Sequence, residues 1–577
     1  MPGQHSADVH DVVQRLTADG IDVVRVSYPD LIGVDRGRDV LVDRLPSVME
    51  HGLAFCRAVF HTSPQGDVVD IAGGLDAGLP DICVRPDLST LAAIPWEPGV
   101  AQCLGEAYEP DGAEPCAEGP REVLRRAIGR LAELGLVPVV GPELEYYLCE
   151  PDPASPAGWR RYGGGPGNVY TVGRGSDPCG HLLGALRNLR DLGLGVTMGN
   201  HEFSSGQFEI NLDHSGALDA ADRAFRLKSA VKEIARAEGR MATFMAKPFN
   251  DDGGSGFHVH LSCTDETGHN LFDGPDAGPD GLSPLAHQAI AGVIAHAPAL
   301  AAVFNPTVNS YKRFGPDTLA PWLVDWGLDN RSAMVRVPPE RGGATRLEVR
   351  LGDAGANPYL GIAALLAAAY LGIRDKLTAP PPLEGYGYDT AKAARLPGDL
   401  TAALDALAAT PTSQACSATG SSAPIWPTSG TRSPGSSGTS PTGSCASTPG
   451  ICKETALSTD TLPVDLADVD NFLDGRTPWR MFDELRRTEP VHWNPETDGG
   501  SGFWSVTRHA DIVAVDRDAA TFTSTRFVNL EEVDERQAAI RRSMLETDGP
   551  RHMALRRLLQ REFTPGRSRG TPRSCAA

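Results

Sequence analysis

The sequence lacks most of the features that mark secreted, membrane and nucleic-acid-binding proteins. Its 577 residues carry 53 Lys and Arg against 74 Asp and Glu, and the resulting net charge of −21 argues against nucleic acid or anionic membrane as a main partner. The 11 cysteines include no Cys-x-x-Cys pair, as expected of reduced thiols. Residues 1–13 show no signal pattern, and the longest apolar helix that we expect, residues 361–373, is too short to span a bilayer. These absences predict a soluble, cytoplasmic protein.

The most informative stretch is an apolar run that carries two carboxylates. Residues 137–148 read as a buried strand, in which alternation places Glu143, Glu145 and Tyr147 on one face. Two neighbouring carboxylates repel each other and lose hydration when they are enclosed, and a bound cation would relieve both costs. The alternative for a single such pair is a solvated polar face of an antiparallel sheet.

The same sequence pattern recurs in three later segments. Residues 200–210, 254–262 and 346–351 each alternate polar with apolar side chains. Their polar faces carry Glu202, Gln207 and Glu209; His258, His260 and Ser262; and Arg346, Glu348 and Arg350. Four such faces predict adjacent strands that line one cavity.

The order of the segments predicts an α+β protein. Residues 1–112 read as a small, mostly β domain entered by one helix over residues 9–19, and residues 113–410 read as a larger domain of strands and helices. Its helices are expected at residues 121–134, 182–192, 217–237 and 284–297. In the third of these, we assign Lys228 and Lys232 to a solvated face.

Five arginines fall between the third and fourth polar strands or on the fourth: Arg313, Arg331, Arg336, Arg346 and Arg350. Arginines beside glutamates can be structural ion pairs. Together with carboxylate-bound divalent metals they are also what phosphoryl transfer requires, because metals and guanidiniums neutralise the phosphate oxygens. The sequence has no Walker motif and no kinase glycine-rich loop, so a nucleotide would have to be held in another way.

In this order and spacing the motifs resemble those of the glutamine synthetases. The matching stretches are Gly-Pro-Glu-Leu-Glu-Tyr-Tyr-Leu, His-Glu-x4-Gly-Gln-x-Glu, Lys-Pro-x6-Gly-Ser-Gly-x-His-x-His, Asn-Ser-Tyr-Lys-Arg, Asn-Arg-Ser and Arg-x-Glu-x-Arg, over about residues 8–410. The resemblance implies a β-grasp-like N-terminal domain, a catalytic domain on a curved antiparallel sheet, and a homo-oligomeric ring with active sites between subunits.

The resemblance also implies roles for individual residues. One metal would be held by Glu145, Glu202 and Glu209, and the other by Glu143, His258 and Glu348; such oxygen-rich sets suit Mg²⁺ or Mn²⁺. Glutamate would contact Gly254, Arg313 and Arg350, whereas ATP and the phosphoryl group would meet His260, Ser262, Arg331, Arg336 and Arg346. ATP would convert the glutamate side chain to an acyl phosphate, and ammonia or an amine would then displace phosphate.

Two departures from the family pattern bear on the amine. No Asp-Gly-Ser-Ser occurs around residues 55–65, and Leu319 stands where the family has a glutamate before Ala-Pro. Both losses remove negative charge that would hold ammonium, which favours a larger amine such as a polyamine or ethanolamine. The alternatives are glutamine synthesis proper, a two-metal phosphohydrolase, and a defective chain, because the family pattern stops before its usual C-terminal helices.

The remainder of the chain is of another kind. Residues 411–460 read as a linker, since 30 of residues 411–450 are Ser, Thr, Pro or Gly with Arg432 as the one charge; a frame-shifted or fused reading frame would also explain them. Residues 461–577 resemble the N-terminal third of haem–thiolate cytochrome monooxygenases, in which His552 and Arg556 would match residues that meet the haem propionates. Cys575 lacks the sequence context of a haem ligand. We therefore expect no haem.

Overall fold

The computed structural model describes residues 4–63, 66, 68–69, 78–155, 158–163, 167–274, 276, 278–316, 318–410, 466, 479–494, 503–518 and 521. The chain divides into two compact units, Met1–Ser437 and Gly438–Ala577. The predicted boundaries at residues 112 and 410 stay predictions, and the segment 411–460 lies outside the described residues.

The first unit begins with a small sheet that is preceded by helix α1 (Gln4–Ala18). Its five strands lie in the order β2-β1-β5-β4-β3, and β1 and β5 run parallel while the other neighbours are antiparallel. The strands are β1 (Val23–Pro29), β2 (Asp35–Leu41), β3 (Leu53–Cys56), β4 (Asp81–Ala93) and β5 (Val100–Tyr108), with helix α2 (Leu45–His51) before β3. The mostly β character expected from the sequence is confirmed.

A ten-stranded sheet forms the centre of the same unit. Its path is β13-β14-β15-β12-β6-β9-β8, and β7, β10 and β11 pair with β6 outside this path. The four strands with polar faces are therefore neighbours, in the order β15-β12-β6-β9, as their sequences predict. The strands are β6 (Val137–Pro151), β7 (Trp159–Arg161), β8 (Val196–His201), β9 (Gln207–Leu212), β10 (Ser215–Gly216), β11 (Met241–Thr243), β12 (Gly256–Thr264), β13 (Trp326–Leu328), β14 (Val335–Val337) and β15 (Leu347–Asp353).

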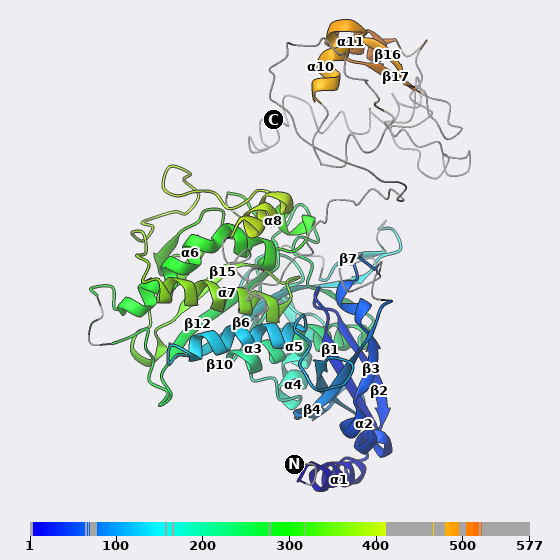
Figure 1. Ribbon diagram of the computed structural model, residues 1–577, viewed down its shortest axis with the longest axis vertical. Coiled ribbons are helices and arrows are strands. Elements are labelled where there is room, and N and C mark those ends of the chain that lie inside the picture. The colour runs from blue at the N-terminus through cyan, green and yellow to red at the C-terminus, as the bar shows by residue number, and fades with distance from the viewer. Residues whose placement is uncertain are drawn as a thin grey trace, which may run out of the picture. The chain divides into compact units, whose positions relative to one another are not determined.

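Helices cover the apolar face of this curved sheet (Figure 1). Alternation sends Leu144, Phe208, Val259 and Val349 into the same core as the apolar sides of the helices. Since the helices take that face, the Glu, His and Arg side chains of the strands share the other one. The helices are α3 (Pro120–Ala132), α4 (His181–Asp191), α5 (Ala217–Ala237), α6 (Pro284–Phe304), α7 (Pro358–Arg374) and α8 (Leu400–Ala409).

Two expectations about these helices are wrong. Helix α6 continues through Pro298 to Phe304, so it exceeds α7, and among the described helices it is long and apolar enough to cross a membrane. Its apolar window is 67% buried within the protein, as in the core helix of a globular domain. The second error concerns Lys228 on α5, which is buried rather than solvated. Its amine donates to the carbonyl oxygen of Ala356 at 2.8 Å.

The described part of the second unit is a small α/β arrangement. It contains α10 (Trp479–Thr488), the antiparallel pair β16 (Val491–Asn494) and β17 (Phe503–Val506), and α11 (His509–Arg517). Trp493 and Trp504 lie opposite each other across the pair, with 5.1 Å between the centres of their tilted rings. His552, Arg556 and Cys575 lie outside the described residues, so the resemblance of this part to haem–thiolate proteins stays a prediction.

Candidate active site

Strand register brings the predicted acidic residues and histidines together on the polar face of the large sheet. Glu143 of β6 lies opposite His258 of β12, and His260 of β12 lies opposite Glu348 of β15. On the other side of β6, Glu145 lies opposite Glu209 of β9. Directly opposed side chains are close neighbours across a sheet, so three pairings assemble a cluster from segments up to about 200 residues apart in sequence.

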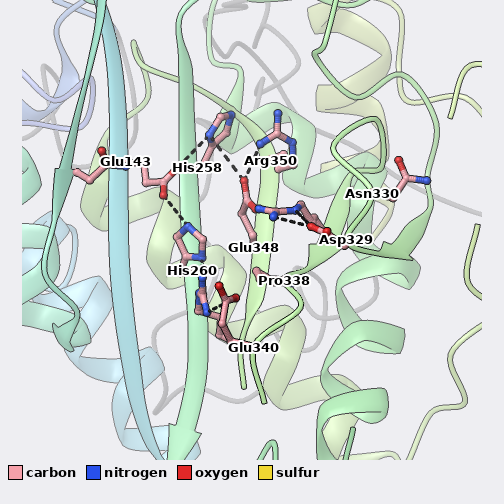
Figure 2. A network of polar contacts seen from close by, with 12 residues as sticks. Glu143, His258, His260, Asp329, Asn330, Pro338, Glu340, Glu348 and Arg350 are labelled. Carbon is pink, nitrogen blue, oxygen red and sulfur yellow. Dashed lines mark hydrogen bonds and ion pairs between the residues drawn. The ribbon is translucent and has the colours of Figure 1, made fainter. Parts of the chain in front are cut away.

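His258 stands at the centre of this cluster (Figure 2). Its Nδ1 lies 3.4 Å from Glu143 Oε2 and 3.9 Å from Glu348 Oε1, and its Nε2 lies 3.8 Å from Glu145 Oε1. The neighbouring His260 makes a shorter contact, 2.9 Å from its Nε2 to Glu143 Oε1. Glu143 is thus shared between both imidazoles.

Two groups of side chains place their donor atoms closely enough to hold a metal ion: Glu143, Glu209 and His258, and Glu143, His260 and Glu348. Carboxylate oxygens with one imidazole fit Mg²⁺ or Mn²⁺. The structure therefore brings together four of the six predicted ligands in these groups and adds His260. Glu145 reaches His258 directly, as described above, and Glu202 lies between β8 and β9 with its Oε1 2.7 Å from Asn200 Nδ2.

The carboxylates differ sharply in electrostatics. Burial raises the pKa of Glu202 to about 7, with Glu145 as the next cause. Burial and then the charges of Glu143 and Glu145 raise the pKa of Glu209 well above its ordinary value. Carboxyl groups that resist ionisation in this way gain from a cation between them.

At the other end of the cluster, neighbouring hydrogen bonds and positive charges outweigh the effect of burial, and the pKa values of the carboxyl groups are lowered. Burial opposes ionisation of Glu143, but hydrogen bonds from His258 and His260 hold its pKa well below the ordinary value. Burial likewise opposes ionisation of Glu348, whereas Arg350 and the two histidines lower its pKa to about 2. Both carboxylates are ionised at neutral pH.

Two of the predicted arginines hold Glu348 from both sides. Arg350 Nη1 lies 2.6 Å from its Oε1, and Arg336 Nη1 lies 2.6 Å from its Oε2. Arg336 also donates to Asp329 (Figure 2). A third, Arg346, donates from Nε to His260 Nδ1 at 3.2 Å. These arginines make ion pairs and hydrogen bonds, and they also lie at the edge of the acidic cluster.

The other predicted residues lie at different depths. Arg313, at the end of the 3-10 helix Val308–Arg313, is buried and donates to the carbonyls of Leu351 and Arg350. Gly254 lies against it, since a Cβ on Gly254 would stand 2.5 Å from Arg313 Cγ. Arg331 is exposed in the turn between β13 and β14, and Ser262 is half-buried on β12, two residues beyond His260.

Sequence reasoning missed the side chains that orient the carboxylates. Gln207 donates to Glu145 Oε2 at 3.0 Å and to the carbonyl of Gly254 at 3.0 Å, and the backbone N–H of Gly256 donates to the same Glu145 oxygen at 2.9 Å. Gln207 was visible on the polar face of its strand, but the partner that it holds depends on strand pairing. Asn200 and Asn211, which hold Glu202 and Glu209, carried no motif signal.

Leu319 lies beside the arginine side of the cluster. Its carbonyl accepts from Arg350 Nη2 at 3.5 Å, and its side chain is 40% exposed. The backbone of Leu319 has a φ of 60°, a left-handed conformation that is uncommon for a residue with a branched side chain. Such strain is found at functional sites more than elsewhere.

Comparisons with known proteins agree with this geometry. The family described as "Glutamine synthetase, catalytic domain" matches residues 117–416. A glutamine synthetase from Methanocaldococcus jannaschii is 34% identical over 412 residues, which cover 69% of this chain and 89% of that protein. A glutamate–isopropylamine ligase from Pseudomonas sp is 35% identical over 388 residues, which cover 66% and 83%. A solved structure described as a GmaS/ADP complex superposes with a TM-score of 0.60 at 34% identity and covers 69% of this chain and 90% of that one.

Proposed function

Because the chain belongs to the glutamine synthetase family, we propose that it is an ATP-dependent ligase that joins the side-chain carboxylate of glutamate to a primary amine larger than ammonia. One observation carries the ligase chemistry: Glu143, His258 and Glu348 meet on adjacent strands with Arg336 and Arg350 on either side of Glu348. This arrangement combines a place for divalent cations with guanidiniums at its rim.

The reaction has two steps. A glutamate side-chain oxygen attacks the γ-phosphorus of ATP, which gives an acyl phosphate and ADP; the amine nitrogen then attacks the acyl carbon, and phosphate and a proton leave. Arg313 and Arg350 bind the glutamate, while Arg331, Arg336 and Arg346 bind phosphate oxygens and stabilise the charge on the group in transfer. His260 and Ser262 contact the nucleotide, and Gly254 leaves room for the substrate beside Arg313.

Divalent cations, Mg²⁺ or Mn²⁺, would neutralise phosphate charge in this site. The residues that would hold them are Glu145, Glu202 and Glu209 at one position and Glu143, His258 and Glu348 at the other. The raised pKa values of Glu202 and Glu209 support this assignment, because nearby carboxylates (Glu145 for Glu202, and Glu143 and Glu145 for Glu209) add to the effect of burial and make both groups costly to ionise.

The preference for a larger amine rests on Leu319. An ammonium ion makes few contacts and depends on carboxylates to hold and deprotonate it, whereas an alkyl amine also gains from burial of its carbon chain. Leu319 is exposed and apolar, and its backbone carbonyl lies 3.5 Å from Arg350 Nη2. The relatives do not decide the matter, since a glutamine synthetase and a glutamate–isopropylamine ligase are almost equally similar to the chain.

Glutamine synthesis proper is the second candidate, because several relatives of comparable identity carry that name. In either case we place the protein in the cytoplasm as a homo-oligomer whose subunits complete one another's sites. Gel filtration tests this part, because a monomer with full activity would contradict it.

The decisive experiment measures glutamate-dependent release of phosphate from ATP with a panel of ammonium, methylamine, isopropylamine, ethanolamine and a polyamine. We expect a primary amine to give a higher kcat/KM than ammonium. Leu319→Glu should shift the ratio toward ammonium by about tenfold, because a charge-assisted hydrogen bond to ammonium is worth about 1.5 kcal/mol or more. Leu134→Glu is the matched control, since Leu134 is 41% exposed and contributes nothing to the site.

The outcomes separate the candidates. Ammonium as the best acceptor for the unmodified protein would return the chain to glutamine synthesis. ATP hydrolysis that needs neither glutamate nor amine would favour a two-metal phosphohydrolase. A folded oligomer without any turnover would indicate a defective chain.

A further inference from the structure

A cavity of about 910 Å³ lies between the small sheet and helix α5, and its lining includes no residue of the acidic cluster around His258. Strands β1 and β2 and the turn that joins them form one wall, and α5 with β11 and the residues after it forms the other. None of the predicted catalytic, metal-binding or nucleotide-binding residues lines it. Its volume is within the range of small-molecule sites.

Basic side chains outnumber acidic ones on the cavity walls. The five basic residues are Arg25, Arg38, Lys228, Lys232 and Arg236, and the three acidic ones are Asp35, Asp39 and Glu233. Two of these carboxylates are already paired, because Arg25 lies 2.9 Å from Asp39 and 3.6 Å from Glu233. On the walls as a whole, the five cations exceed the three carboxylates by two charges.

Two of those cations, Lys228 and Lys232, stand one turn apart on the same face of α5, so their Cβ atoms are about 5–6 Å from each other. Both amines lie beside the ring of Phe244, at 5.9 and 5.8 Å from its centre. Within the described part of the chain, neither lysine forms an ion pair with a carboxylate, and the hydrogen bonds of Lys228 go to the backbone carbonyls of Gly355 and Ala356. Two like charges therefore face one cavity, and the carboxylates that act on them, Asp35 on Lys232 and Asp353 on Lys228, do so without a direct ion pair.

This arrangement is costly unless an anion joins it. Burial, followed by the charge of Lys232, lowers the pKa of Lys228 to about 7, whereas Asp353 acts in the opposite direction. A buried ammonium without a partner is unfavourable, and a bound anion would supply the missing charge. Next to the amines, Phe244, Met241 and Met245 offer an apolar wall for a short carbon skeleton.

We propose that this cavity binds a small dianion, either a phosphate group or a dicarboxylate, through the ammonium groups of Lys228 and Lys232. Two donors one helical turn apart match the oxygens of one phosphate or the two carboxylates of a short diacid. This cavity is separate from the acidic cluster around His258, and the proposal that it binds a dianion does not depend on the proposed reaction.

The test is protection of the lysines from acetylation by an uncharged N-hydroxysuccinimide ester, followed residue by residue with peptide mass spectrometry. The full-length protein is treated with inorganic phosphate, glycerol phosphate or succinate, each against chloride at the same ionic strength. We expect acetylation of Lys232 and Lys228 to slow by about fivefold or more in a saturating dianion. Lys376 and Lys392, which are exposed elsewhere, are the internal controls and should keep their rates.

The comparison of phosphate with succinate identifies the source of the dianion. Equal rates in dianion and chloride, or equal protection of Lys376, would overturn the proposal. The variants Lys232→Met and Lys232→Arg supply a second readout on an exposed residue that folding tolerates. Lys232→Met should abolish the protection of Lys228 and Lys232→Arg should retain it; unchanged protection in Lys232→Met would also overturn the proposal.

Discussion

The two ends of the acidic cluster meet the same cost of buried charge in different ways. At the β12–β15 end, histidines and arginines hold Glu143 and Glu348, and the pKa values of both carboxyl groups are lowered. At the β8–β9 end, Glu202 and Glu209 accept hydrogen bonds from the amides of Asn200 and Asn211, and their pKa values are raised. One end carries its cations in the fold, and we propose that metal ions from solution supply them at the other.

The contrast predicts opposite effects on stability when one carboxylate is removed from each end. Glu348→Ala leaves the buried Arg350 without its carboxylate partner and leaves Arg336 with Asp329 alone, and breaking a buried pair in this way costs about 3–5 kcal/mol. Glu209→Gln removes a repelling carboxyl group, so the metal-free protein should be as stable as the unmodified one or more so. Chemical denaturation in EDTA measures both.

Turnover should fall in both variants, by roughly 10²–10³-fold or more, because each removes a group that would stabilise charge in the site. Glu145→Ala should lose turnover to a similar extent while the fold persists. Near-normal activity of any of the three at saturating Mg²⁺ would contradict the ligand assignment. If Glu348→Ala were as stable as Glu209→Gln, the difference between the two ends would be wrong.

A second way to separate the two ends is the pH dependence of stability without metal. The folded pKa of Glu202, about 7, lies above its ordinary value of 4.5, so its contribution is complete below pH 4.5 and is lost as pH rises through 7. The folded pKa of Glu348, about 2, lies below 4.5, so its contribution is present above pH 4.5 and is lost as pH falls toward 2. Stability in EDTA should therefore decline in both directions.

The loss above pH 4.5 should be on the order of 3 kcal/mol, given about 1.4 kcal/mol for each unit of pKa shift. Mg²⁺ should restore more stability at pH 8 than at pH 6, since only ionised carboxylates bind it well. Glu202→Gln is the control that should make the limb above pH 4.5 shallower, because only Glu209 then contributes a raised pKa, and it should leave the acid limb unchanged. A wild-type curve as flat as that of Glu202→Gln between pH 5 and 8 would contradict the prediction.

These two ends also show how far the sequence alone could lead. Period-two alternation placed Glu143, His258 and Glu348 on polar faces, and the structure confirms that their strands are neighbours. Alternation carries no information about register, however, and register decides that His260 reaches Glu143 and that Gln207 reaches Glu145. The divided electrostatics of the cluster therefore could not be read from the motifs.

The errors in the helices have a similar origin. Proline usually ends a helix, but Pro298 lies within α6 because the core packs on both sides of it. Lys228 has the spacing of an exposed position on α5, yet the chain after β15 returns to cover it and provides the carbonyls of Gly355 and Ala356. Tertiary contacts overrode the local pattern in both places, and for Lys228 they come from a segment more than 100 residues away.

The smallest effect on turnover is expected from changes to the C-terminal part of the chain, in contrast to changes in the acidic cluster. Of residues 411–450, 30 are Ser, Thr, Pro or Gly, and the few apolar residues among the rest cannot form a core. Limited proteolysis should therefore cleave there first. Removal of residues 438–577, the whole second unit, should change the turnover of the first unit by less than about twofold, because every residue that we assign to the site belongs to the first unit. Full-length protein supplied with haem should show no thiolate-type band with carbon monoxide, since Cys575 lacks the sequence context of a haem ligand. A protease-resistant tail, a thiolate band, or a large loss of turnover on its removal would each show that the C-terminal part belongs to the working enzyme.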